Sequence, residues 1–196
     1  MQRRHFLLVI GFCWICGAFP VYAAPGPGTY VIDPSHSKVA FEIGHLVISS
    51  VEGRFREFSG TLVIGPKVPE LKVLVVAASI NTEEPKRDKH LRSPDFFDVE
   101  QFPHIAFESQ KITGDINKKF QVHGNLSIRG VTRPVVLDAV YLGQAKDPWG
   151  VMRYAYKAKT QINRKDYGLV WNKIVEVGPL VGDEAELSLQ VEMIQK

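Results

Sequence analysis

Apolar and polar residues alternate along most of this sequence, which is the pattern of β-strands that bury one face. Val39, Phe41 and Ile43 alternate with Lys38 and Glu42, so the apolar side chains share one side of an extended segment. The same period of two recurs in residues 71–77, 105–109, 135–141, 154–162 and 187–193. Turn-forming pairs at 33–34, 65–66, 114–115 and 147–148 separate these runs. The pattern predicts about eight or nine strands in one all-β domain.

One segment breaks the alternation. Residues 83–97 are rich in charge, have Pro85 near their start and carry Leu91, Phe96 and Phe97. We predict one or two short helices here, which cross between strands and cover one end of the fold. Closure of many antiparallel strands into a barrel removes exposed edges, and eight strands leave room for side chains or one slim ligand. The pattern alone leaves a two-sheet sandwich open as the alternative.

The first 23 residues are predicted to be a cleaved signal peptide. Arg3 and Arg4 precede an apolar stretch over residues 6–19, which is short for a membrane span, and Ala23 ends a segment typical of a cleavage site. Cys13 and Cys16 lie in this leader, so the mature chain, residues 24–196, contains no cysteine. We therefore expect an exported, periplasmic domain that is stable without disulfides.

Charge and histidine spacing exclude several classes of function. Removing Arg3 and Arg4 from the 24 basic residues leaves 22 against 21 acidic ones, which gives no case for nucleic acid. The histidines of the mature chain have neither zinc-site spacing nor a cysteine beside them; they are His36, His45, His90, His104 and His123. No metal and no cofactor is expected, and no catalytic residue is predicted.

The inward face of the predicted strands is apolar and aromatic. The predicted barrel lining consists of Val39, Phe41, Ile43, His45, Phe107, Tyr154, Tyr156, Ile162, Leu187, Leu189, Val191 and Met193. Such a lining suits a long hydrocarbon with a small head group, and His45 could contact that head group. The alternative is a barrel whose side chains simply fill its core.

An enzyme acting on an amphiphilic small molecule is a second alternative. Asp33 and His36 stand beside Ser35 and Ser37 and contain the residue types of a hydrolytic triad. Neighbouring positions on an extended segment point to opposite faces, which disfavours assembly of a triad. Asp33 is better explained as a turn former before Pro34.

Several short motifs occur together and in order along the chain. They are YVIDPSHS at 30–37, HL at 45–46, GRFREFSG at 53–60, DKHLRSPDFFD at 88–98, FP at 102–103, GNLSIRGVTRPV at 124–135, RKDYG at 164–168 and VGDE at 181–184. This set resembles the YceI-like family of lipocalin-like, polyisoprenoid-binding proteins over residues 28–194. One small departure is Ala185, where a β-branched residue is expected.

The resemblance implies a single extended antiparallel eight-stranded barrel that holds a polyisoprenoid, such as a prenyl quinone or a polyprenyl carrier lipid. It also implies export to the periplasm and supplies no catalytic set. The expected partners are an isoprenoid lipid or quinone and a transient contact with a membrane, and a homodimer is left open.

Two further groups of residues are candidates for contact with a ligand. Trp149 and Trp171 are each expected in a connection between strands, and together they would form aromatic lips at the barrel mouth. Ordinary anchoring of loops is the alternative. The arginines Arg54, Arg129, Arg133 and Arg164 are expected to pair strand ends, and any of them could hold a phosphate-bearing head group.

Overall fold

The computed structural model describes residues 25–66 and 68–196. The predicted signal peptide and its two cysteines lie outside these residues. The strands are β1 (Gly28–Ile32), β2 (Lys38–His45), β3 (Ser49–Phe55), β4 (Phe58–Ile64), β5 (Glu70–Val76), β6 (Ile80–Asn81), β7 (His104–Gly114), β8 (Lys119–Ile128), β9 (Val131–Lys146), β10 (Met152–Asn163), β11 (Ile174–Val175), β12 (Gly178–Pro179) and β13 (Val181–Gln195).

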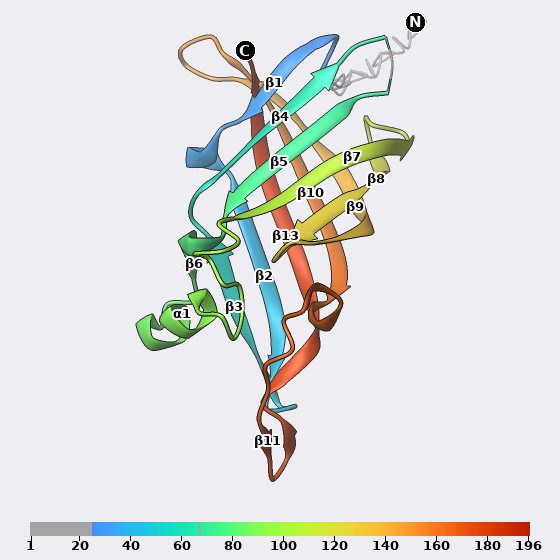
Figure 1. Cartoon of the computed structure of the whole chain (residues 1–196). Coiled ribbons are helices and arrows are strands. Elements are labelled where there is room, and N and C mark those ends of the chain that lie inside the picture. Colours follow the sequence, from blue (N-terminus) through green and yellow to red (C-terminus); the bar gives the residue numbers. More distant parts are fainter. Residues whose placement is uncertain (1–24, 67) are drawn as a thin grey trace, which may run out of the picture.

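Eight of these strands close into an antiparallel barrel (Figure 1). The order around the wall is β1, β4, β5, β7, β8, β9, β10 and β13, and the pairing of Tyr30 with Gln195 joins the last strand to the first. The long pairings of β10 with β13 and β9 carry most of the wall on one side. The predicted all-β eight-stranded barrel is therefore confirmed, and the sandwich alternative is wrong.

Three bends divide long chain segments into shorter strands. A 3₁₀ turn at Pro34–His36 separates β1 from β2, a bend at residues 56–57 separates β3 from β4, and a second 3₁₀ turn at Ala77–Ser79 separates β5 from β6. Beyond these bends, β2 pairs with β13, β3 with β2, and β6 with β3. These strands extend the wall beyond the closed barrel toward the β11 end of the molecule (Figure 1).

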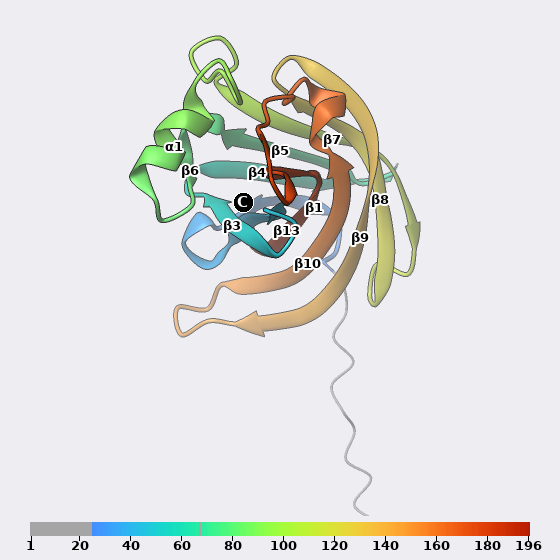
Figure 2. The ribbon, with the colours of Figure 1, turned by 90° about the horizontal axis from the view of Figure 1, so that it is seen from below.

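The predicted helical crossover is present as α1 (Pro85–Arg92), which lies beside β3 and β6 (Figure 2). Its first turn is capped by Glu84, whose carboxylate accepts hydrogen bonds from the backbone N–H groups of Lys86 and Arg87. The buried Asp88 accepts hydrogen bonds from the N–H and hydroxyl groups of Thr82, which fixes α1 against β6. No helix among the described residues has both the length and the apolar character needed to cross a membrane.

Arg153 gathers three carboxylates where β1, β10 and β13 meet. Its guanidinium contacts Asp33 at 2.5 Å, Asp147 at 3.1 Å and Glu192 at 3.4 Å. The hydrogen bond from Arg153, followed by that from His36, lowers the pKa of Asp33 to about 2 from 3.8. The ionised carboxylate therefore ties the first bend of the chain to the barrel wall.

The low pKa of Asp33 predicts a loss of stability in acid. A carboxylate whose pKa is lowered by folding stabilises the fold above its unfolded pKa, and this contribution disappears as the pH falls through the folded value. Wild-type protein should therefore exceed Asp33→Asn in stability at neutral pH, and the difference should shrink between about pH 4 and pH 2. Urea unfolding of both proteins across this pH range measures the difference in the free energy of unfolding. A difference that does not change with pH would show that the ion pair of Asp33 does not stabilise the fold.

Candidate functional site

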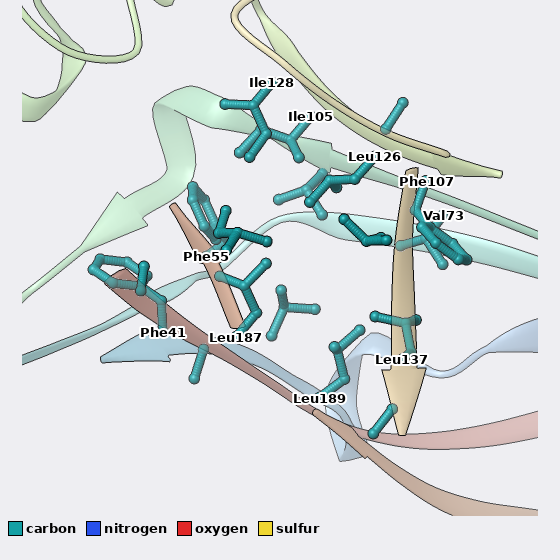
Figure 3. A pocket seen from close by; sticks show the side chains of 18 of the residues that line it. Phe41, Phe55, Val73, Ile105, Phe107, Leu126, Ile128, Leu137, Leu187 and Leu189 are labelled. Carbon is teal, nitrogen blue, oxygen red and sulfur yellow. The ribbon is translucent and has the colours of Figure 1, made fainter. Parts of the chain in front are cut away.

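The barrel encloses a cavity of about 550 Å³ that is lined almost entirely by apolar side chains (Figure 3). This volume lies in the range of small-molecule binding sites. The labelled side chains in Figure 3 come from strands on all sides of the barrel and point into one space; they are Phe41, Phe55, Val73, Ile105, Phe107, Leu126, Ile128, Leu137, Leu187 and Leu189. The interior therefore contains a cavity, and the side chains that line it also form the hydrophobic core of the barrel.

The cavity reaches solvent at the end that carries α1. Gly44 and Lys86 are exposed although they line the cavity, and all other lining residues are buried or half-buried. Both lie near the rim formed by α1, β3 and the segment around β11, which Figure 2 shows from this side. We call this end the mouth. At the opposite end, which we call the closed end, the cavity is lined by Pro25, Ile116 and Phe120, none of which is exposed.

Polar side chains that line the cavity gather at the mouth. Thr82, Glu84, Arg87 and His90 all lie on α1 or directly before it. Arg87 donates to the hydroxyl of Thr82 at 2.8 Å and to its carbonyl at 2.9 Å, which holds the guanidinium beside the opening. The result is a small polar rim on an otherwise apolar cavity, with the charged groups confined to one end.

Trp171 covers part of the mouth and packs on α1. Its ring meets the rings of His90 and Phe96 with centroid separations of 4.8 and 5.2 Å. His90 is held in turn by Asp95, with Nε2 and the carboxylate oxygen 2.8 Å apart. Trp171 therefore bridges the helix and the segment between β10 and β13.

Arg164 fixes the segment that carries Trp171. Its side chain is 3% exposed and donates hydrogen bonds to the carbonyls of Leu169, Trp171 and Gly182. Burial lowers the pKa of this guanidinium, yet an arginine remains charged at neutral pH. One buried cation therefore satisfies three backbone acceptors and sets the position of the rim.

Four tyrosines pack near the closed end of the barrel. Tyr141 lies 5.2 Å from Tyr156, and Tyr30 lies edge-on to Tyr154 at 5.4 Å, measured between ring centroids. Burial raises the pKa of Tyr141 to about 12 and raises that of Tyr156 as well. These phenols stay neutral near pH 7, so the closed end presents no charge to the cavity.

The match to a family model decides what kind of barrel this is. The model for the YceI-like domain matches residues 30–193, which span the barrel and its mouth. This chain belongs to the YceI-like domain family. The resemblance carried by the short motifs is thereby confirmed.

Relatives and solved structures of this YceI-like barrel agree with its fold. A UPF0312 protein of Azotobacter vinelandii is 37% identical over 172 residues, which cover 85% of this chain and 87% of the relative. The crystal structure of a Campylobacter jejuni YceI protein superposes with a TM-score of 0.67 at 32% identity, covering 79% of this chain and 90% of that one. A polyisoprenoid-binding domain from Saccharophagus degradans superposes with a TM-score of 0.62 at 15% identity, covering 85% and 98%, and this likeness shows the fold.

The predicted lining of this YceI-like barrel is almost entirely in place. Of the twelve predicted residues, eleven line the cavity: Val39, Phe41, Ile43, His45, Phe107, Tyr156, Ile162, Leu187, Leu189, Val191 and Met193. Tyr154 does not, because its ring packs on Tyr30 beyond the cavity end. Their role in binding a ligand remains a prediction.

Sequence reasoning missed much of the wall on β4, β5, β8 and β9. The missed apolar lining includes Leu62, Val73, Val75, Val122, Leu126, Leu137 and Ala139. The alternation in residues 71–77 and 135–141 gave a signal for four of these. The polar rim had no such signal, since its position depends on how α1 packs.

The two tryptophans do not form a pair of lips at the mouth, which was one of the two alternatives left open from the sequence. Trp171 lies after β10 and lines the cavity, whereas Trp149 lies before β10, in the β9–β10 hairpin. The twelve residues of β10 place them about 36 Å apart along the strand. Trp149 is 83% exposed and lies at the end opposite the mouth.

The arginines and histidines separate into structural and cavity-lining groups. Arg129 donates to the carbonyls of Gly168 and Pro94, and Arg54 pairs with Glu83 at 3.2 Å. Of the four arginines named from the sequence, only Arg164 lines the cavity. Of the five histidines, His45 and His90 do. No group of three potential metal ligands forms among the described residues.

The residues of the supposed triad are joined in a different way. His36 pairs with Asp33 at 2.8 Å, Ser35 contributes its backbone N–H to the same carboxylate, and the hydroxyl of Ser37 accepts from the N–H of Glu192. No bond joins His36 to either serine hydroxyl in the described part of the chain. Asp33 is instead part of the Arg153 ion pairs and does not line the cavity, so these residues serve the bend.

Proposed function

We propose that this protein is a periplasmic carrier that holds a polyisoprenoid lipid, of prenyl quinone or polyprenyl type, in the barrel cavity. The observation that carries the proposal is the shape and chemistry of the cavity: a deep apolar interior with polar groups confined to its mouth. A hydrocarbon tail fits the interior and a small polar head group fits the rim. The structural neighbour from Saccharophagus degradans, described as a polyisoprenoid-binding domain, supports this choice of lipid.

The size of the apolar contact supports a long-lived complex. A tail of about 40 carbons at about −0.3 kcal/mol per heavy atom gives roughly −12 kcal/mol, which corresponds to about nanomolar affinity. A ligand bound this tightly would stay with the protein through purification. A carrier of this kind needs affinity for the lipid and an opening to the cavity. None of its residues has to make or break a covalent bond.

The rim supplies candidate contacts for the head group. Arg87 offers the guanidinium N–H groups that Thr82 does not use, whereas the Thr82 hydroxyl already donates to Asp88. Glu84 is occupied as the cap of α1, and His45 lines the cavity from the end of β2. Neutral quinone oxygens accept hydrogen bonds from such donors without requiring a buried counter-charge. We infer that the head group lies beside α1 while the tail runs toward Phe120.

Saturable binding tests the proposal. Delipidated protein is titrated with a long-chain prenyl quinone delivered from cyclodextrin, and quenching of Trp171 fluorescence by the quinone reports occupancy. A polyprenol delivered in the same way is measured by its competition with the quinone. Binding of one lipid per barrel with submicromolar affinity is the expected result. A straight-chain alcohol of equal carbon number serves as the comparison for the branched tail. Failure of both prenyl lipids to saturate the protein would rule out the proposed cargo.

A further inference from the structure

An exposed cluster of aliphatic side chains lies next to the mouth of the cavity. This cluster, which we call the apical patch, consists of Val47 and Ile48 in the β2–β3 turn and Ile174, Val175 and Val177 in the β11–β12 hairpin. Val47, Ile48 and Ile174 are 70%, 81% and 78% exposed. Figure 1 shows both hairpins together at the narrow end of the molecule.

The two hairpins form one surface. The N–H of Leu46 donates to the carbonyl of Leu180 at 3.1 Å, which joins the β2–β3 turn to the chain just after β12. A Cβ atom on Gly178 would lie only 3.4 Å from Cγ2 of Val47, so the second hairpin approaches the first closely. The patch is therefore a continuous projecting tip rather than two scattered loops.

The β2–β3 turn keeps its aliphatic side chains at positions that normally favour other residues. The N–H of Ile48 donates to the carbonyl of His45, with Leu46 and Val47 at the centre of the turn. Their φ angles are 53° and 66°, where glycine, asparagine or aspartate is usual and a β-branched residue is an outlier. Val47 keeps a β-branched side chain at this strained position although that side chain is 70% exposed, which points to a role outside the barrel.

The patch is continuous with the route that a lipid must take. His45 lines the cavity and directly precedes the first turn of the patch, and Leu180 and Val181 line it directly after the second hairpin. Trp171 lines it three residues before Ile174. A ligand that leaves the cavity at the mouth therefore emerges beside the apical patch.

We propose that the apical patch inserts into the surface of a lipid bilayer and positions the mouth for exchange of the bound lipid. This inference rests on the function proposed above. Five aliphatic side chains on a projecting tip are far fewer than the roughly 20–30 residues that each partner contributes to a standard protein interface. They suit shallow insertion among lipid head groups, where buried apolar area sets the affinity.

The charges around the tip indicate which bilayer it meets. Lys173 precedes the hairpin and Glu176 lies in its turn, between Val175 and Val177, so the local charge is balanced. Insertion is therefore driven by apolar contact, and the protein binds zwitterionic vesicles with little dependence on salt. Anionic lipid is not required.

Flotation with phosphatidylcholine vesicles tests the inference on the mature protein. The variant combines Val47→Gly, Ile48→Ser and Ile174→Ser, and we expect its partition to vesicles to fall about tenfold or more. Trp149→Ser is the matched control, because it removes a side chain of similar exposure at the opposite end of the barrel. The control should bind vesicles like wild type.

Two further readouts separate docking from folding and from lipid binding. Val47→Gly alone should raise the melting temperature, since glycine suits the positive φ, and should still weaken flotation. All variants should bind cyclodextrin-delivered prenyl quinone like wild type, since none of the replaced side chains lines the cavity.

Three results would overturn the inference: wild-type flotation in the triple variant, loss of flotation in Trp149→Ser, or a wild-type dimer that the triple variant dissociates. Failure of wild-type protein to bind cyclodextrin-delivered quinone is a different outcome. It removes the proposed cargo, and the flotation result then decides docking separately.

Discussion

Replacing Ala158 with tryptophan is expected to weaken binding of a prenyl lipid about a hundredfold or more, a change of roughly 3 kcal/mol. Ala158 lies in the middle of β10 and lines the cavity, between Ala139 on β9 and Leu189 on β13, which line it too. An indole at this position occupies the space that the lipid tail needs. Because it enters a cavity rather than a packed core, the barrel should keep its stability.

The control for this prediction is Lys157→Trp, one residue earlier on the same strand. Lys157 is exposed on the outer wall, so the same side chain placed there leaves the cavity untouched. Titration with prenyl quinone and a thermal melt of both variants give the comparison. Wild-type affinity in Ala158→Trp would show that lipid does not occupy this part of the barrel. A severe loss of stability in it would show that the site is packed.

Replacing Arg164 with methionine should lower the free energy of unfolding by about 3–5 kcal/mol. The change leaves the carbonyls of Leu169, Trp171 and Gly182 without their buried donor, and each such acceptor costs about 1–3 kcal/mol when nothing replaces it. The segment that carries Trp171 then loses the link through Arg164 to Gly182 on β13, whereas the hydrogen bonds of Asn172 and Lys173 still hold it there. Tryptophan fluorescence should shift to longer wavelength, because Trp171 becomes more exposed.

Lys165→Met provides the comparison at the next position. Lys165 pairs with Asp183 at 2.8 Å but is exposed, so its loss should cost less than about 1 kcal/mol. Urea unfolding followed by circular dichroism and fluorescence measures both variants. Equal unfolding midpoints for the two variants would mean that the hydrogen bonds of Arg164 do not hold the rim.

The barrel could be predicted from the sequence because its signal is local. Val39, Phe41 and Ile43 face the cavity and Lys38 and Glu42 are exposed, as a period of two requires. The turn-forming pair at 33–34 marked the first bend, but the bends at residues 56–57 and Ala77–Ser79 had no such signal. The bend before β2 depends on Asp33 meeting Arg153, which is 120 residues away in the chain.

The mouth could not be derived in the same way. The charged segment predicted a helix, but the position of that helix depends on the buried contact between Asp88 and Thr82. Arg164 was singled out from the sequence, yet its three acceptors lie in a loop and at a strand end that no periodic pattern describes. The Tyr154 error has a similar cause, since alternation gives the face of a strand and not where along it the cavity ends.

The most direct test of the carrier function is organic extraction of the protein purified from a periplasmic fraction, followed by mass spectrometry against a matched blank. We predict a prenyl quinone or polyprenol in about one-to-one ratio with the barrel, consistent with the nanomolar affinity expected for a long tail. Extraction of no lipid above the blank, from protein that also takes up no added prenyl lipid, would contradict the proposal.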